Sequence, residues 1–427
     1  MVNLDDTISL VVFVVFFALA ITYFSTLNRP DRIELESLAG NIADKILTPG
    51  YLTWNVTKTY VIVNASSAQN LYPVDIYIAF PDQVKSNSVR ARYHDTGKEV
   101  GFVYANVSTG EFVMLANLSA GKNIFGVFYS DTDATGIEPN SDLGANGLLF
   151  SNDDLAGEFS PDGDIVSVSY RNGDNPWLRD RLFLGASRYQ ASSYTVTRVP
   201  VRIQYDFTNG SATKTFKIYA FNSIIRLNIS AASYTWNMRF ATAINRTFAN
   251  SDISMNGTNT LVFSNTADFV DVYTSPGSTT TGIAFSDKNI NATVYDAAGY
   301  REFNISNTTA SSYEMYYHHG SYANGKPYND LRVSPGATQL ATDLIEGVKA
   351  SKITDFNATG YAAIKQRVGS SKDFHIEIEN SSDGTLLLDY GKQPSNFTEV
   401  VVHRKALNLL TTDYDFQKVV LRVKTWN

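Results

Sequence analysis

An uninterrupted apolar segment near the N-terminus constrains this chain more than any other feature. The twenty residues Ile8–Leu27 read ISLVVFVVFFALAITYFSTL and contain no charged side chain. As a helix the segment would be about 30 Å long, which is close to the hydrocarbon thickness of a bilayer. No Lys or Arg precedes it and no A-x-A site follows it, which argues against a cleavable signal peptide. The sequence therefore predicts a retained membrane segment.

Residues 31–47, which follow this segment, have the apolar spacing of a one-sided helix. Its apolar positions are Leu35, Leu38, Ala39, Ile42, Ala43 and Ile46. Pro49-Gly50 is a typical helix stop. We therefore expect one long N-terminal helix within residues 1–55, apolar all round at first and amphipathic afterwards.

The rest of the chain has the pattern of a mainly β protein. From Asn55 to about Pro335, short alternating stretches such as Val74–Phe80 are separated by turn residues at the spacing of a β-sandwich. An aromatic content of 13% supports a sheet-rich structure. The C-terminal part reads as mixed α/β, with helices expected at Thr338–Ala350 and Gly360–Val368 and strands at Asp373–Glu379, Thr385–Tyr390, Thr398–Ala406 and Lys418–Thr425.

Both ends of the chain resemble archaeal type IV pilin-like surface filament proteins. The resemblance rests on ILTPGYLTWN at residues 46–55, YAAIKQRVGSSKDFHIEI at 361–378, VVVHRKALN at 400–408 and VVLRVKTW at 419–426. It implies a pilin-like α/β domain built from residues 1–55 and 337–427. Residues 56–336 would then be an inserted, β-sandwich-like, glycosylated domain.

The resemblance also implies a function: a non-catalytic structural subunit of an archaeal cell-surface filament, possessing adhesive β domains outside and apolar helices in the filament core. The implied partners are other copies of the chain, the membrane before assembly, the pilus assembly machinery and a leader peptidase. The helix residues expected to assemble are Asp5, Ile8, Leu10, Val12, Val15, Phe16, Leu19 and Tyr23. Pilins normally carry a basic leader with a Gly or Ala cleavage site, which is not present in this sequence. Pilins also tend to have an acidic residue near the mature N-terminus, and Asp5 fills that role if Met1 is the mature terminus.

Two other functions stay open at this point. One is a membrane-anchored extracellular adhesin or binding ectodomain that does not polymerise. The other is an extracellular carbohydrate-active enzyme that uses carboxylates such as Asp162 and Asp164.

Glycosylation sequons support an exported chain. The sequon N-x-S/T occurs about twice as often as the roughly seven occurrences expected by chance for this composition. The acceptor asparagines are Asn55, Asn64, Asn106, Asn117, Asn209, Asn228, Asn245, Asn256, Asn291, Asn304, Asn307, Asn357, Asn380 and Asn396. We therefore expect N-linked glycans and a location at the archaeal cell surface.

Signals for catalysis or cofactors are weak. The chain has no cysteine and no G-x-S-x-G, H-E-x-x-H, P-loop or G-x-G-x-x-G motif. A net charge of −7 without a long basic run argues against nucleic acid as a partner. The sequence therefore predicts no catalytic, cofactor-binding or metal-binding residues.

Three groups of residues could bind a ligand, but each has a simpler structural interpretation. His318-His319 is expected to be a surface pair rather than a metal site, because adjacent strand residues face opposite ways. Tyr313, Tyr316, Tyr317 and Tyr322 could bind sugar or a neighbouring subunit, but are expected in the core or rim of the sandwich. Calcium could bind the acidic groups, which are expected to be solvated turn residues: Asp131, Asp133, Asp153, Asp154, Glu158, Asp162 and Asp164.

Overall fold

The computed structural model divides the chain into two compact units, residues 1–58 with 343–427, and residues 59–342. It describes residues 13–20, 30–47, 52–65, 68–131, 141–170, 177–240, 342–394, 400–410 and 416–426, together with the strands between residues 247 and 334. Mainly β structure, as the sequence predicts, is confirmed.

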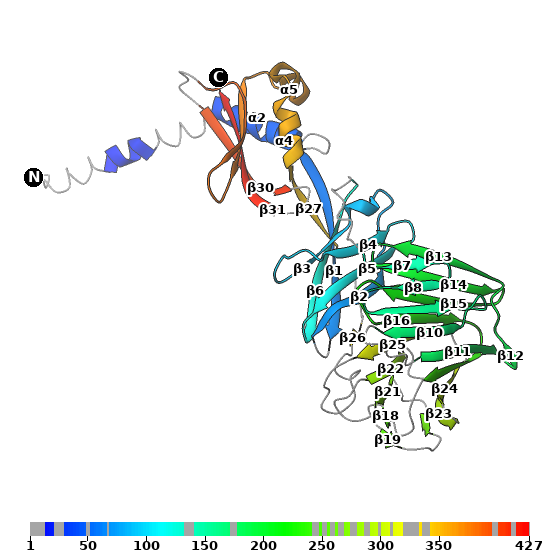
Figure 1. Ribbon diagram of the computed structural model, residues 1–427. Helices are drawn as coiled ribbons and strands as arrows, with labels where there is room; N and C mark the ends of the chain where they lie inside the picture. Colours follow the sequence, from blue (N-terminus) through cyan, green and yellow to red (C-terminus); the bar gives the residue numbers. More distant parts are fainter. Residues whose placement is uncertain are drawn as a thin grey trace, which may run out of the picture. The chain divides into compact units, whose positions relative to one another are not determined.

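The first unit is a sheet with a helix packed on one face (Figure 1). Its strands follow the order β29 (Leu386–Gly391), β28 (Phe374–Asn380), β31 (Phe416–Trp426), β30 (Val400–Leu410) and β27 (Thr342–Lys349). Helix α2 (Pro30–Ile46) packs on β30 and β31. The buried side of α2 carries Ala39, Ile42, Ala43 and Ile46, as the one-sided spacing predicts.

The prediction of a helix at Thr338–Ala350 is wrong over the part that the structure describes. Residues 342–349 form β27, which pairs in parallel with β30, and helix α4 starts only at Ala350 and ends at Asn357. The reason is close packing: a Cβ on Gly347 would lie 2.4 Å from the carbonyl oxygen of Asn408, so glycine allows the two strands to approach. The second expected helix is confirmed as α5 (Tyr361–Val368), which ends at Gly369 in the left-handed conformation.

A single long N-terminal helix is not shown. Residues 13–20 are helical with exposed side chains, α2 begins at Pro30, and residues 21–29 lie outside the described part. Within the described residues, no helix combines the length and apolar character needed to cross a membrane.

The second unit begins with a small β layer around its own core. Strand β1 (Thr53–Ala65) crosses the division between the units and continues into this layer. The other strands are β2 (Gln69–Tyr77), β3 (Arg90–Tyr93), β4 (Phe102–Asn106), β5 (Glu111–Leu118) and β6 (Gly121–Tyr129), with a short 3-10 helix at Ser86–Ser88. Strands β2, β5 and β4 form one sheet, and β3 pairs with β6. Phe112, Met114, Phe125 and Val127 fill the core between them.

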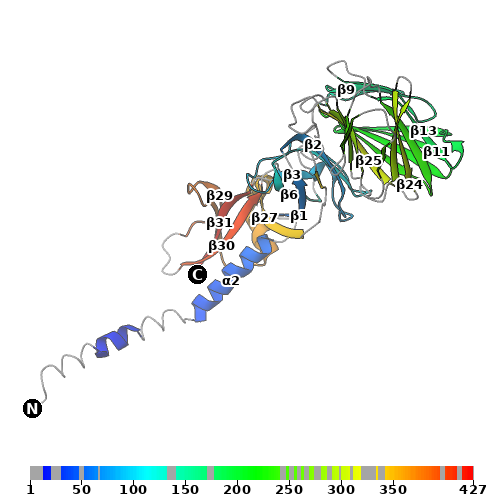
Figure 2. The same cartoon turned by 90° about the horizontal axis from the view of Figure 1, so that it is seen from below.

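The remainder of the second unit is a sandwich of two antiparallel sheets (Figure 2). The β10 sheet follows the order β20 (Leu261–Phe263), β23 (Asn291–Ala297), β24 (Tyr300–Asn307), β17 (Tyr234–Phe240), β11 (Trp177–Leu184), β10 (Ile165–Tyr170), β9 (Leu155–Phe159), β8 (Leu149–Ser151) and β7 (Gly144–Asn146), with β12 (Ser187–Arg188) beside β11. The β15 sheet follows the order β13 (Ser193–Val199), β14 (Arg202–Asn209), β15 (Ala212–Tyr219), β16 (Ile225–Ser230), β25 (Ser311–His318), β22 (Thr280–Phe285), β21 (Phe269–Tyr273), β18 (Thr247–Ala249) and β19 (Ser254–Asn256). The short strand β26 (Val333–Ser334) pairs with β1.

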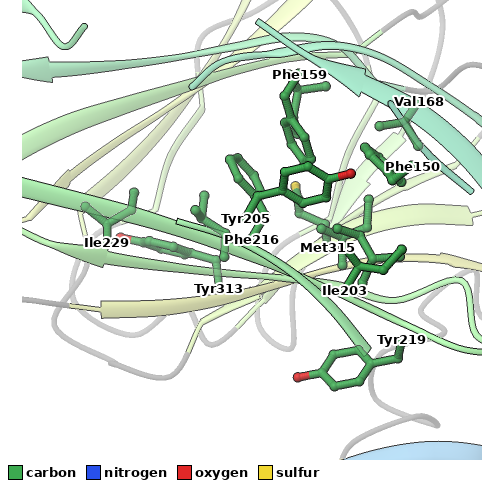
Figure 3. Packing of buried hydrophobic residues seen from close by; sticks show 14 of the residues in the cluster. Phe150, Phe159, Val168, Ile203, Tyr205, Phe216, Tyr219, Ile229, Tyr313 and Met315 are labelled. Atoms are coloured by element: carbon green, nitrogen blue, oxygen red, sulfur yellow. The ribbon is translucent and has the colours of Figure 1, made fainter. Parts of the chain in front are cut away.

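Aromatic side chains fill the space between the two sheets. Figure 3 shows Phe159, Tyr205 and Phe216 gathered in this core. The ring centroid of Phe159 lies 4.8 Å from that of Tyr205 and 4.5 Å from that of Phe216. Each fully buried ring of this size contributes several kcal/mol, about 3–5 when replaced by alanine. The core therefore holds the β10 sheet as a rigid platform for its outer face.

Candidate functional site

The outer face of the β10 sheet is polar and carries the candidate site. Side chains alternate between the two faces of a strand. Phe159, Val168, Leu182, Trp236 and Phe303 point into the core. The strand registers then place the intervening residues on the outer face: Glu158, Ser167, Ser169, Arg179, Arg181, Asn237, Arg239, Glu302 and Asn304.

A hollow of about 520 Å³ lies on this face at strands β7 to β10. Its lining consists of small, hydroxyl, amide and apolar groups with one carboxylate: Gly144, Ala145, Asn146, Leu149, Phe150, Ser151, Ala156, Gly157, Glu158, Ser167 and Ser169. Glu158 lies directly opposite Ser167, and Ala156 lies opposite Ser169. The small side chains of Ala156, Ser167 and Ser169 create the hollow, because they leave the sheet floor exposed between the larger residues at its rim.

The floor of the hollow is closed from below by an aromatic ring. A Cβ on Gly157 would lie 2.4 Å from Cζ of Phe150 and 2.7 Å from the carbonyl oxygen of Ser167. Glycine is therefore required at this position for β8, β9 and β10 to pack as they do. Phe150 itself is buried in the sandwich core, so it supports the floor.

Arginines occupy the next two strands of the same face. Arg179 on β11 lies directly opposite Arg239 on β17, and Arg181 is the next outward residue of β11. Arg239 donates to Glu302 Oε2 at 2.7 Å, and Asn237 Nδ2 donates to Glu302 Oε1 at 3.1 Å. The pKa of Arg181 is lowered from its ordinary value, first because the side chain is partly desolvated and then because Arg179, Arg239 and Arg188 surround it.

A buried ion pair lies beneath this face. Lys214 and Asp180 are both fully buried and pair with each other, and Trp236 Nε1 donates to Asp180 Oδ2 at 2.9 Å. Lys214 Nζ also donates to the Gly163 carbonyl at 2.8 Å and lies 3.8 Å from Asp164 Oδ1. Burial raises the pKa of Asp164 above its usual value, although Lys214 opposes the shift. The pair joins β11 of one sheet to β15 of the other.

A second charged network joins the β2 sheet to the β15 sheet. Asp75 Oδ2 accepts from Lys217 Nζ at 2.7 Å and from the Tyr219 hydroxyl at 2.9 Å. Burial alone would raise the pKa of Asp75, but Lys217, Arg226 and Arg202 outweigh it and hold that pKa below its usual value. These charged groups pair with one another, so we interpret the network as a structural link between the sheets and not as a ligand site.

The structure places the acids considered for calcium in separate environments. Asp164 and Asp162 both pair with Arg188, Glu158 lines the hollow, and Asp133 lies outside the described residues. Across the described ranges, no three acidic or histidine side chains gather in a way that could hold a metal ion. Asp162 and Asp164 are therefore engaged by Arg188 and do not form part of the hollow.

The histidine and tyrosine candidates do not form a site in the described part. Tyr313 and Tyr316 are buried in the two cores, and the Tyr313 hydroxyl lies 2.5 Å from that of Tyr234. The side chains of Tyr317 and His318 are not described, and His319 and Tyr322 lie outside the described residues.

The residues expected to assemble fall mostly outside the described part. Val15, Phe16 and Leu19 lie on the helical residues 13–20 and are exposed. The others lie outside it: Asp5, Ile8, Leu10, Val12 and Tyr23.

Comparisons with known proteins give a structural likeness and no family. No protein-family model matches the chain, and no curated protein matches it significantly. Among solved structures, an alpha-mannosidase from Enterococcus faecalis V583 matches with a TM-score of 0.40 and 9% identity over 62% of this chain. A protein in glycosyl hydrolase family 38 from Enterococcus faecalis matches with a TM-score of 0.41 and 9% identity over 69%. The chain spans less than half of each of these proteins, 43% and 48%.

These findings correct the pilin-like interpretation. The solved structures that match include an alpha-mannosidase and a glycosyl hydrolase family 38 protein, which contradicts the resemblance to pilins, the filament function and the expectation that the chain is not an enzyme. The anchored-adhesin alternative is not better supported than the filament. The physical reason is that an amphipathic helix followed by alternating strands fits many helix-on-sheet domains, so the end segments were not specific. At these TM-scores the likeness transfers no activity to this chain, and the proposal below rests on the site alone.

Proposed function

We propose that the second unit binds a neutral or acidic saccharide in the hollow on the outer face of the β10 sheet. The observation that carries the proposal is the composition of this hollow: hydroxyl, amide and carboxylate groups around a floor of small side chains. A sugar ring presents donors and acceptors around its edge and C–H groups on its faces. The lining offers partners for both kinds of surface.

The polar groups of the hollow are suited to sugar hydroxyls. Glu158 accepts hydrogen bonds only, Asn146 both donates and accepts, and the serine hydroxyls do either. A hydrogen bond to a charged group contributes about 1.5–3 kcal/mol, more than a neutral one. Glu158 is therefore expected to supply the largest single polar contribution.

The rim and floor supply the apolar contact. Leu149 is 49% exposed at the rim, and Ala156 lies on the floor. A sugar ring laid on these groups would cover apolar surface that now faces water. Because all the lining residues belong to paired strands, the hollow is preformed and little ordering is needed on binding.

The proposal is confined to binding. Glycoside hydrolysis commonly uses two carboxyl groups that flank the scissile bond. Among the described lining residues, Glu158 is the one carboxylate.

Two substitutions in the hollow test the proposal. Glu158→Gln removes the charged acceptor, so the dissociation constant for a neutral oligosaccharide should rise about tenfold or more. Ala156→Trp fills the floor and should abolish binding. A glycan array followed by calorimetry with the best neutral oligosaccharide measures both effects.

Asp82→Asn is the matched control, because it removes an exposed carboxylate from the turn after β2 without touching the hollow. This variant should bind as the unchanged protein does. Binding that survives both Glu158→Gln and Ala156→Trp would show that the hollow is not the site.

We also propose that the chain is exported and carries N-linked glycans. The support comes from the exposed sequons: Asn64, Asn117 and Asn357 are exposed in the described part of the chain. Asn209 differs, since its Nδ2, the atom that would carry a glycan, donates to the Gln190 carbonyl at 2.7 Å. Insertion of residues 8–27 in a membrane stays a prediction.

Peptide mapping of the protein from its native cells tests this second proposal. The intact mass should exceed 47.2 kDa, and glycans should be found at Asn64, Asn117 and Asn357. Asn117→Gln should remove the mass of one glycan. Unmodified asparagine at all three positions would remove the support for export.

A further inference from the structure

We propose that the arginines beside the hollow bind the negatively charged substituent of an acidic saccharide. This inference rests on the proposed function and specifies its ligand class. The cluster consists of Arg179 and Arg181 on β11 and Arg239 on β17.

Among the residues that the structure describes, the cluster carries more positive than negative charge. Two arginines directly opposite on adjacent strands repel each other, and the arrangement is destabilising without a counter-charge. Glu302 pairs with Arg239. Arg179 and Arg181 lie next to that pair on the neighbouring strand.

Polar atoms at the cluster have unused hydrogen-bonding capacity. Nε of Arg181 is buried and has no hydrogen-bond partner, and the same is true of Oδ1 of Asn237 and Oδ1 of Asn304, among the residues that the structure describes. A buried donor without a partner costs free energy. A guanidinium group presents donors in a planar fork that matches a carboxylate or a sulfate.

The pKa of Arg181 agrees with this geometry. Burial of the side chain lowers it first, the like charges of Arg179, Arg239 and Arg188 lower it further, and Asp164 opposes the shift. Since arginine stays protonated in proteins, the lowered pKa expresses partial desolvation together with repulsion by like charges, not loss of charge. An anion at this place would relieve the repulsion.

The cluster and the hollow are parts of one surface. Strand β10 lies between β9, which carries Glu158, and β11, which carries Arg179. Adjacent strands are about 4.8 Å apart, so the strand of Glu158 lies about 10 Å from β11 and about 14 Å from β17. One oligosaccharide can therefore reach both, with its uncharged hydroxyls in the hollow and its anionic group on the arginines.

The separation also predicts the orientation of the bound oligosaccharide. Glu158 repels an anionic group from the hollow, whereas the arginines attract it on the β11 side. Asn237 and Asn304, which lie opposite each other on β17 and β24, extend the polar face beyond the arginines. The anionic substituent is thus placed away from Glu158.

The experiment compares three trisaccharides with one backbone: the galactose trimer, the galacturonate trimer and the 6-sulfated galactose trimer. We expect at least one acidic trimer to bind about tenfold tighter than the neutral one, and this preference to shrink in 0.5 M salt. Preference for galacturonate identifies a carboxylate ligand, and preference for the sulfated sugar identifies a sulfate ligand.

Arg181→Gln should remove most of this tenfold preference, and Arg179→Gln should weaken it in the same direction. Neither substitution should lower the melting temperature, because each removes a repelled cation. Lys122→Gln, which removes an exposed lysine of β6, should keep the preference.

The two proposals can fail separately. If none of the neutral or acidic sugars binds, the proposed function is wrong. If neutral sugars bind and the acidic trimers bind no tighter, or if the preference survives both arginine substitutions, only the arginine site is wrong.

Discussion

Replacing Lys214 with methionine is expected to lower the free energy of unfolding by about 3–5 kcal/mol. Methionine has nearly the length of lysine, so the main loss is the charge and not the packing volume. Without Lys214, Asp180 stays buried with hydrogen bonds from Trp236 and the Ile165 backbone but no cation at its side. Asp164 loses its second cation and keeps only Arg188. Urea denaturation measures the change.

A double-mutant cycle separates the pair from its surroundings. Asp180→Asn keeps the shape of the side chain and leaves the Lys214 charge without its main partner. The double variant Asp180→Asn with Lys214→Met should be less destabilised than the sum of the singles, because it leaves neither charge of the pair behind. Lys122→Met, on an exposed lysine, is the control for lysine removal. Additive single effects would show that the pair is not coupled.

The loss of unfolding free energy caused by Lys214→Met should depend on pH. Burial already raises the pKa of Asp164, and removing Lys214 removes a cation that opposes the shift. A carboxyl group whose pKa is higher in the folded state binds protons more tightly there, so stability falls as the pH rises above the unfolded value near 3.8. The variant should therefore be less destabilised at pH 5 than at pH 8.

Secondary structure could be predicted where the pattern had one interpretation. The one-sided spacing of Leu35, Ala39, Ile42 and Ile46 gave α2, and these residues are buried. The alternation of VVLRVKTW gave β31, with Val419, Leu421 and Val423 buried. In both cases local period and tertiary burial agree.

The segment at residues 342–349 shows where local pattern fails. TDLIEGVK has helix-forming residues at helical spacing, yet parallel pairing with β30 makes it a strand. That pairing depends on Asn408, about sixty residues later, which no local window includes. Tertiary context overrides propensity here.

The candidate site was missed for a related reason. The alternation of IVSVSY is that of a strand with a solvated face, but WLRDRLFL, in which Arg179 and Arg181 flank Asp180, lacks so clear a pattern. Which strands are neighbours, and therefore that Ser167 lies near Glu158 and Arg179 opposite Arg239, follows only from the sheet order. The aspartates that sequence reasoning singled out, Asp162 and Asp164, pair instead with Arg188.

Residues 59–342, expressed alone, are expected to fold and to unfold in a cooperative transition. The two cores of this unit consist entirely of its own residues, from Val61 to Tyr316. The core of the other unit draws on residues 39–52 and 348–423. Because no buried residue of these clusters is shared, removing one set leaves the other complete. At 284 residues the fragment is large enough to bury a core of its own.

The fragment should also keep the saccharide affinity of the full chain, since the hollow and the arginine cluster lie within it. Thermal melting followed by circular dichroism, together with calorimetry on the same sample, measures both properties. The matched control is the fragment with Trp236→Ala, which removes a fully buried ring and should cost about 3–5 kcal/mol. A fragment that aggregates, or that melts without a sharp transition, would show that strands outside residues 59–342 complete its fold. A fragment that folds but no longer binds would instead place part of the site in the removed segments.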